Sequence, residues 1–241
     1  MEINTRQLRS MVADVDDAHH DSMRTLRSEL EEIHFGETGR QLVAGRRAFL
    51  KQAGAGAALV TIGGLALPAS GILARAAAAQ EDLPFDVIAA TYAAGVELAA
   101  VAAYDAAAAR GLLDQATVSL AVTFQGHHRD HAGTFNGLLE SNGQPTVDQP
   151  DGGLLSQFGP MIQTAPDVPA LLDIALTLEQ AAAATYVDSL GQLTLPEAAL
   201  AVAQIAPVES QHALVLATAL NKPVEERLPA FETTSSSLLE N

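Results

Sequence analysis

Two short stretches of the sequence place metal-binding side chains three residues apart. Glu209 precedes His212 in one stretch, and His128 precedes His131 in the other. Residues three apart in an α-helix lie on one face, with Cβ atoms roughly 5–6 Å apart. Each stretch could therefore aim two ligands at one point, and carboxylate oxygens with imidazole nitrogens form a donor set that suits iron, manganese or zinc.

A glutamate stands upstream of each stretch. Glu97 lies 34 residues before His131, and Glu179 lies 33 residues before His212. A lone glutamate on an alanine-rich helix is usually a surface residue. Here the recurrence of nearly the same spacing favours a second pair of ligands that completes the site.

A tyrosine follows each upstream glutamate by seven residues, at Tyr104 and Tyr186. Seven residues are about two helical turns, so each phenol shares a face with its glutamate. We expect both to be core phenols that hydrogen-bond to a neighbour, behind a glutamate of the site. The glutamates and the tyrosines recur after 82 residues and the two histidine-bearing pairs after 81, which indicates an internal repeat of a helical hairpin.

Four helices must carry these residues. Capping and stop signals predict them over residues 84–111, 114–143, 167–191 and 194–221. The short connections after Gly111 and after Gly191 make the helices of each hairpin antiparallel neighbours. A polar loop with a short apolar piece at 154–162 joins the two hairpins.

The composition bounds the class of protein. The 241 residues are 48% hydrophobic but only 4% aromatic, which favours helices packed through small side chains, and the absence of cysteine excludes disulfides and thiolate metal sites. Residues 1–79 hold nine acidic and nine basic residues, which leaves 20 acidic and four basic residues and the whole net charge of −16 to the remainder. This charge argues against nucleic acid as a partner and favours cations.

A motif in the N-terminal third resembles a twin-arginine export signal. Its residues are Arg46, Arg47, Phe49 and Leu50. A weakly apolar run over 53–73 and a small-residue zone ending near Ala79 follow. We expect the twin-arginine translocase to move the chain across the cytoplasmic membrane, to the periplasm, the cell envelope or the medium, with an uncleaved membrane anchor as the alternative.

The expected organisation has four parts. They are a cytoplasmic N-terminal extension at 1–44, the signal at 45–79, the bundle at 80–221 and a flexible tail at 222–241. Within the extension, residues 21–33 predict a solvated amphipathic helix. His19, His20 and His34 have no partner pattern and are interpreted as surface residues.

The order of the candidate ligands resembles the ferritin-like superfamily of di-iron and dimanganese carboxylate bundles. The leader and the alanine-rich hairpins are similar to exported bacterial ferritin-like-domain proteins. The resemblance covers about residues 84–221 and implies an all-α, ferritin-like antiparallel four-helix bundle built from two repeated hairpins. The metal ligands that it implies are Glu97, His131, Glu179, Glu209 and His212, and His128 is the sixth candidate ligand.

One position departs from the family pattern, because His128 stands where the family has a glutamate. The site then has three negative charges in place of four, which could favour zinc or manganese or a single tight metal. His127 is a substitute ligand, although it points about 100° round the helix from His128. Asp130 and Arg129 are expected to face solvent.

The resemblance implies two bound metal ions, with iron expected and manganese or zinc as alternatives. Dioxygen or peroxide would be the partner of a ferroxidase, peroxide-scavenging or iron-handling activity. The alternative is a non-catalytic envelope scaffold with structural or vestigial metal binding. The sequence leaves open whether the protein is an enzyme and whether it forms an oligomer.

Overall fold

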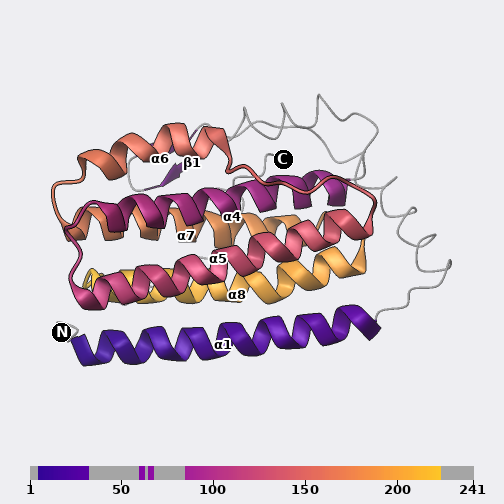
Figure 1. Ribbon diagram of the computed structural model, residues 1–241, viewed down its shortest axis with the longest axis horizontal. Helices are drawn as coiled ribbons and strands as arrows, with labels where there is room; N and C mark the ends of the chain where they lie inside the picture. Colours follow the sequence, from indigo (N-terminus) through magenta and orange to yellow (C-terminus); the bar gives the residue numbers. More distant parts are fainter. Residues whose placement is uncertain (1–4, 33–59, 63–64, 68–84, 224–241) are drawn as a thin grey trace.

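The computed structural model of the protein describes residues 5–32, 60–62, 65–67 and 85–223 (Figure 1). The helices are α1 (Thr5–Glu32), α4 (Phe85–Ala109), α5 (Gln115–Ser141), α6 (Gly152–Thr164), α7 (Val168–Leu190) and α8 (Pro196–Ala219). Two three-residue strands, β1 (Val60–Ile62) and β2 (Leu65–Leu67), pair antiparallel with Thr61 opposite Ala66.

Helices α4, α5, α7 and α8 form a four-helix bundle made of two antiparallel hairpins, α4 with α5 and α7 with α8 (Figure 1). Helix α5 also contacts α8, and α4 contacts α7. The predicted all-α bundle of two antiparallel helical hairpins is therefore confirmed. Helix α6 packs on the α4 side, and α1 packs on the opposite side against α5 and α8.

Aspartates at the helix starts explain why the bundle helices begin where they do. Asp114 and Asp167 accept hydrogen bonds from the amides of Thr117 and Ala170, which satisfies amide groups that the first turn leaves free. Helix α8 has no side-chain cap of its own. Asp86 of α4 accepts instead from the amides of residues 194 and 195, at 2.6 and 2.7 Å, and so fastens the α7–α8 turn to the first hairpin.

Two apolar clusters fill the bundle, one toward each end. The first includes Val87, Phe135 and Ile205, and the second includes Phe124 and Leu216. The candidate ligands lie between these clusters along every helix. Water is thus excluded above and below the level of the ligands, and polar groups at that level must find partners among themselves.

The structure corrects the expectation for the N-terminal extension. Helix α1 spans 5–32 and is not solvated all round, because Leu8, Val12, Val15 and Leu26 form a buried apolar stripe. His19 lies in the same stripe and is fully buried, so its interpretation as a surface residue is wrong. His20 is exposed as expected, and His34 lies outside the described residues.

The connection between the hairpins is also more ordered than expected. The short apolar piece at 154–162 belongs to α6, capped by Asp151, with Leu154, Phe158 and Ile162 buried. Arg110 donates to the backbone carbonyls of Ile162 and Ala165 and holds the end of α6 on α4. Helix α6 thus covers the outer face of α4 and α7.

The export motif, Arg46, Arg47, Phe49 and Leu50, lies outside the described residues, and so does the tail from 224. The fourfold division of the chain stays a prediction. Among the described helices, α4 is long and apolar enough to cross a membrane, but 56% of its most apolar window is buried inside the protein, as in the core helix of a bundle.

Candidate metal centre

Side chains from four helices meet in the middle of the bundle. They are Glu97 of α4, His128 and His131 of α5, Glu179 of α7, and Glu209 and His212 of α8. Each is at most 2% exposed. Their ligand atoms form two overlapping groups of four, and within each group these atoms lie within 4.8 Å of one another.

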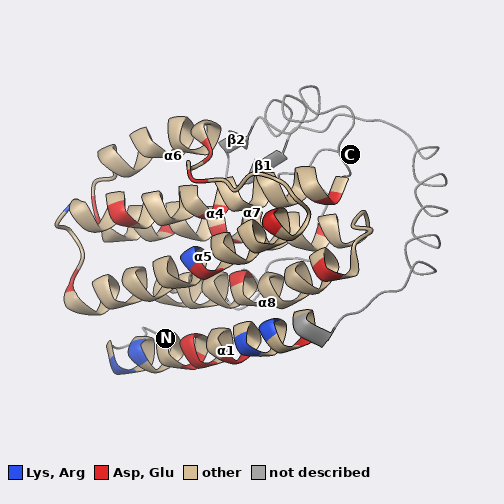
Figure 2. Cartoon of the chain, turned by 45° about the vertical axis from the view of Figure 1, so that its right-hand side comes forward, with Lys and Arg blue, Asp and Glu red and all other residues tan. Residues whose placement is uncertain are grey.

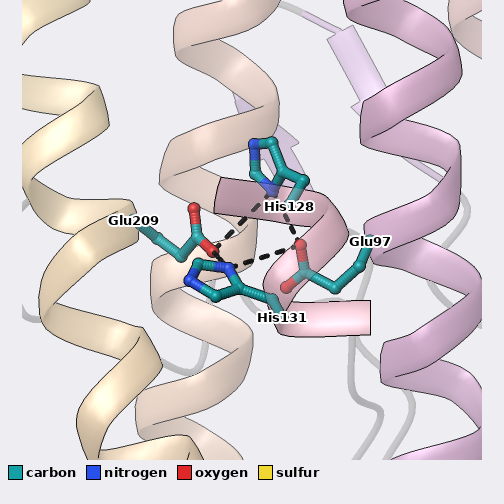
Figure 3. A group of neighbouring side chains, drawn as sticks. All are labelled: Glu97, His128, His131 and Glu209. Carbon is teal, nitrogen blue, oxygen red and sulfur yellow. Dashed lines mark hydrogen bonds and ion pairs between the residues drawn. The ribbon is translucent and has the colours of Figure 1, made fainter. Parts of the chain in front are cut away.

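The first group contains Glu97, His128, His131 and Glu209 (Figure 3). His131 Nδ1 lies 2.8 Å from Glu209 Oε1 and 3.6 Å from Glu97 Oε2. His128 Nδ1 lies 2.7 Å from the same Glu97 oxygen. The second group repeats this arrangement, with His212 Nδ1 lying 3.2 Å from Glu179 Oε2 and 3.1 Å from Glu209 Oε2.

Glu209 and His128 belong to both groups, and each points one ligand atom toward one half and a second atom toward the other. Glu209 directs Oε1 to His131 and Oε2 to His212. His128 directs Nδ1 to Glu97 and Nε2 to Glu179, at 2.7 and 3.2 Å. The internal repeat is therefore visible as two equivalent halves that share these two residues.

The two tyrosines hydrogen-bond to the glutamates, but across the hairpins. Tyr104 of the first hairpin donates to Glu179 Oε1 at 2.5 Å, and Tyr186 of the second donates to Glu97 Oε1. Each phenol thus fixes one oxygen of a glutamate. The other oxygen of Glu97 faces His128 and His131, whereas Glu179 turns Oε2 to His212 and shares Oε1 between Tyr104 and His128. Burial and the neighbouring carboxylates hold the pKa of both phenols well above their usual value, so both stay protonated donors.

Histidines and carboxylates in the centre shift each other's pKa values. Burial alone would raise the pKa of Glu97, but His131 and His128 outweigh it and lower that pKa to about 2. Burial would lower the pKa of His131, but Glu209 and Glu97 raise it to about 9. The pKa values of His128 and His212 are raised in the same way, and that of Glu179 is lowered. Protons on the imidazoles therefore balance the carboxylates when no metal is bound.

One contact shows that the donor set also fits metal ions. His131 Nδ1 and Glu209 Oε1 are 2.8 Å apart, yet among the described residues neither atom makes a hydrogen bond of acceptable angle. Once His131 gives up its Nδ1 proton, these two buried atoms can both face a common cation. Three carboxylates and three imidazoles in two groups suit iron, manganese or zinc.

A cavity of about 80 Å³ reaches the centre from the α6 side. Its polar lining comes from Glu97, Tyr104, His128 and Glu179, and the rest is apolar, with alanines of α4 facing Phe158 and other side chains of α6. A single water needs about 10–15 Å³, so a small molecule such as dioxygen or peroxide fits beside the carboxylates.

The residues flanking the ligands on α5 have other partners. His127 does not reach the carboxylates; its Nδ1 lies 2.8 Å from Nε2 of His212, so it stands behind a candidate ligand. Asp130 faces solvent as expected but lies 3.1 Å from His19 Nε2. Arg129 is exposed and donates to Gln125.

Sequence reasoning missed the contribution of α1 to this region. His19 stacks on His127 with ring centroids 3.9 Å apart, and Asp16 Oδ1 lies 3.0 Å from His127 Nε2. A signal was available, because Leu8, Val12, Val15 and His19 recur at spacings of three and four residues and so mark one helix face.

A family model described as "Ferritin-like domain" matches residues 86–222, which is more than half of the chain. Neither the curated proteins nor the solved structures that were compared with the chain gave a match. The matched region begins in α4 and ends just after α8, so it contains all six candidate ligands and excludes α1.

Proposed function

The chain belongs to the ferritin-like domain family, and from this membership we propose that its bundle holds a dinuclear metal centre, with iron as the metal. The observation that carries the proposal is the pair of buried four-residue groups that share Glu209 and His128. Glu97 and His131 would serve one ion. Glu179 and His212 would serve the other.

The position of each residue in the centre determines its proposed role. Glu209 would be the carboxylate that both ions share, because its two oxygens face different halves. Tyr104 and Tyr186 donate to one oxygen each of Glu179 and Glu97, which would hold these glutamates in place as metal ligands. His128 contributes a neutral ring where a fourth carboxylate would add a negative charge, so the site carries less charge to stabilise an oxidised metal pair.

Two bound iron ions would supply one-electron chemistry with dioxygen or peroxide. The cavity beside Glu97 and Glu179 offers such an oxidant a dry, largely apolar approach. The acidic bundle raises the local concentration of cations at its surface. In Figure 2, aspartates and glutamates are spread over the bundle, while most lysines and arginines of the described residues lie on α1. We therefore propose ferroxidase or peroxide-scavenging activity, with Fe(II) as the substrate.

Metal analysis of the full chain, purified without chelator, tests the proposal. We expect close to two metal ions per chain after loading with Fe(II), and absorbance growth from Fe(II) oxidation that is faster than in buffer alone. A chain that takes up no metal and whose melting temperature does not respond to Fe(II) would leave the non-catalytic scaffold as the function. Two bound metals without oxidation would restrict the role to structural metal binding.

We also propose that the protein is exported by the twin-arginine route, which rests on Arg46 and Arg47 in the sequence. Replacing both by lysine should leave the protein in the cytoplasm as the uncleaved chain. Fractionation of cells that produce either version is the measurement. Equal export of the double variant would contradict this route.

A further inference from the structure

Helix α1 places an acidic side chain against a histidine that touches the metal centre. Asp16 Oδ1 lies 3.0 Å from His127 Nε2, and His127 Nδ1 lies 2.8 Å from His212 Nε2. The other ring nitrogen of His212 faces Glu179 and Glu209. A continuous line of hydrogen-bonding groups therefore runs from α1 to the middle of the bundle.

We propose that Asp16 is a positioning residue of the metal centre, acting through His127 to fix the orientation and the tautomer of His212. The inference rests on the proposed function, because the orientation of His212 matters only if its Nδ1 binds metal. It concerns a residue outside the family match, since α1 precedes residue 86.

The groups at the two ends of this line, His212 and Asp16, determine which ring nitrogens carry protons. If Nδ1 of His212 binds metal, the remaining ring proton lies on Nε2 and is donated to His127 Nδ1. The proton of His127 then lies on its Nε2 and is donated to the Asp16 carboxylate. Only this tautomer of His127 satisfies both contacts, and a carboxylate at the end favours it over the other tautomer.

The surroundings of His127 hold the ring in place. It is 2% exposed, and on one face it stacks on His19 with ring planes 21° apart. His19 is in turn held by Asp130 at 3.1 Å. Phe124 stacks on His212 with ring centroids 3.9 Å apart. Rotation of either ring of the His127–His212 pair would break these contacts, so the hydrogen bonds select an orientation that the packing already favours.

Asp16 is suited to an experimental test because its side chain is 43% exposed, so truncation leaves no buried void. Asp16→Ala in the full chain removes the acceptor for His127. Asp16→Glu keeps a carboxylate and should restore the contact. Asp17→Ala, on the exposed face of the same helix, is the matched control. His20→Ala tests the other partner of Asp16, which lies at 3.5 Å.

Two measurements follow the change. In metal-free protein, ¹⁵N NMR of the imidazole rings should show His127 neutral with its proton on Nε2, and Asp16→Ala should produce a mixture of tautomers. In a Co(II) titration followed by visible absorption, Asp16→Ala should weaken binding about tenfold, the lower end of the range for partners behind a ligand, and alter the Co(II) spectrum. Asp16→Glu should recover both signals.

The outcomes separate the inference from the function. If the unmodified chain takes up Co(II) and Asp16→Ala matches Asp17→Ala in tautomer, affinity and spectrum, the positioning role is overturned while the metal centre stands. A proton on Nδ1 of His127 in the unmodified chain would overturn it as well. If the unmodified chain takes up no Co(II), the metal centre and the inference fail together.

Discussion

Removing Glu209 and removing Glu97 should affect the metal centre to different extents. Glu209 belongs to both four-residue groups, whereas Glu97 belongs to one. Glu97→Gln leaves the second group complete, so this variant should retain about one ion per chain. Glu209→Gln removes the shared carboxylate, so both ions should be weakened and little metal should survive desalting.

The metal-free protein should also respond to the loss of Glu209. This residue lies 2.8 Å from His131 Nδ1 and 3.1 Å from His212 Nδ1, and all three side chains are fully buried. Without Glu209, His131 keeps only Glu97 at 3.6 Å, so part of the stabilisation that raises its pKa to about 9 is lost. The pKa lies two units above pH 7, so this loss is at most roughly 3 kcal/mol. The free energy of unfolding should fall by up to that amount.

The assays are mass-spectrometric metal content after loading and desalting, and thermal unfolding of the metal-free chains. A loss of roughly 3 kcal/mol corresponds to a melting temperature lower by roughly 6–12 °C for a protein of this size. Glu140→Gln, an exposed change on α5, is the control. Equal metal content in Glu97→Gln and Glu209→Gln would refute the shared role of Glu209, and an unchanged melting temperature would refute the charge balance.

Three further predictions concern pH, charge and α1. The pKa of His131 is raised to about 9, so the stabilisation from its charge is complete below about pH 6.5 and is lost as the pH rises through 9. The free energy of unfolding measured in urea should therefore fall over that pH range for the metal-free protein and stay constant for the cobalt-loaded protein. His128→Glu adds a fourth buried carboxylate, which should lower the metal-free melting temperature and slow the release of Fe(III) to a chelator. If cleavage near Ala79 removes Asp16, the exported form should release Co(II) to a chelator faster than the full chain.

Features that depend on neighbours in sequence could be predicted. Asp114 and Asp167 cap their helices because a side chain reaches an amide three residues ahead, and that relation is local. The i,i+3 pairs are local in the same way. The repeated spacing of Glu97 and Glu179 from their histidines then sufficed to predict two equivalent hairpins, since similar hairpins place equivalent residues at similar heights.

Features that depend on which surfaces meet could not be predicted. Each tyrosine shares a helix face with the glutamate seven residues before it, but seven residues rise roughly 10 Å along the axis, which a phenol cannot span. Tyr104 and Tyr186 therefore reach across to the other hairpin. Likewise, the apolar stripe of α1 predicts a buried face without specifying that α5 and α8 cover it, and so the burial of His19 was missed.

His128 breaks the charge symmetry of the repeat while keeping its geometry. At the equivalent position of the second hairpin, Glu209 offers two oxygens to the two halves, and His128 offers two nitrogens. A fourth carboxylate here would need a cation or a proton to fold in the dry core, because like charges at this distance repel strongly. Protonated His128 lies between Glu97 and Glu179 and supplies that positive charge itself. The bundle can therefore fold before metal arrives. An incoming ion must then displace a proton from His128, the residue that contacts both halves.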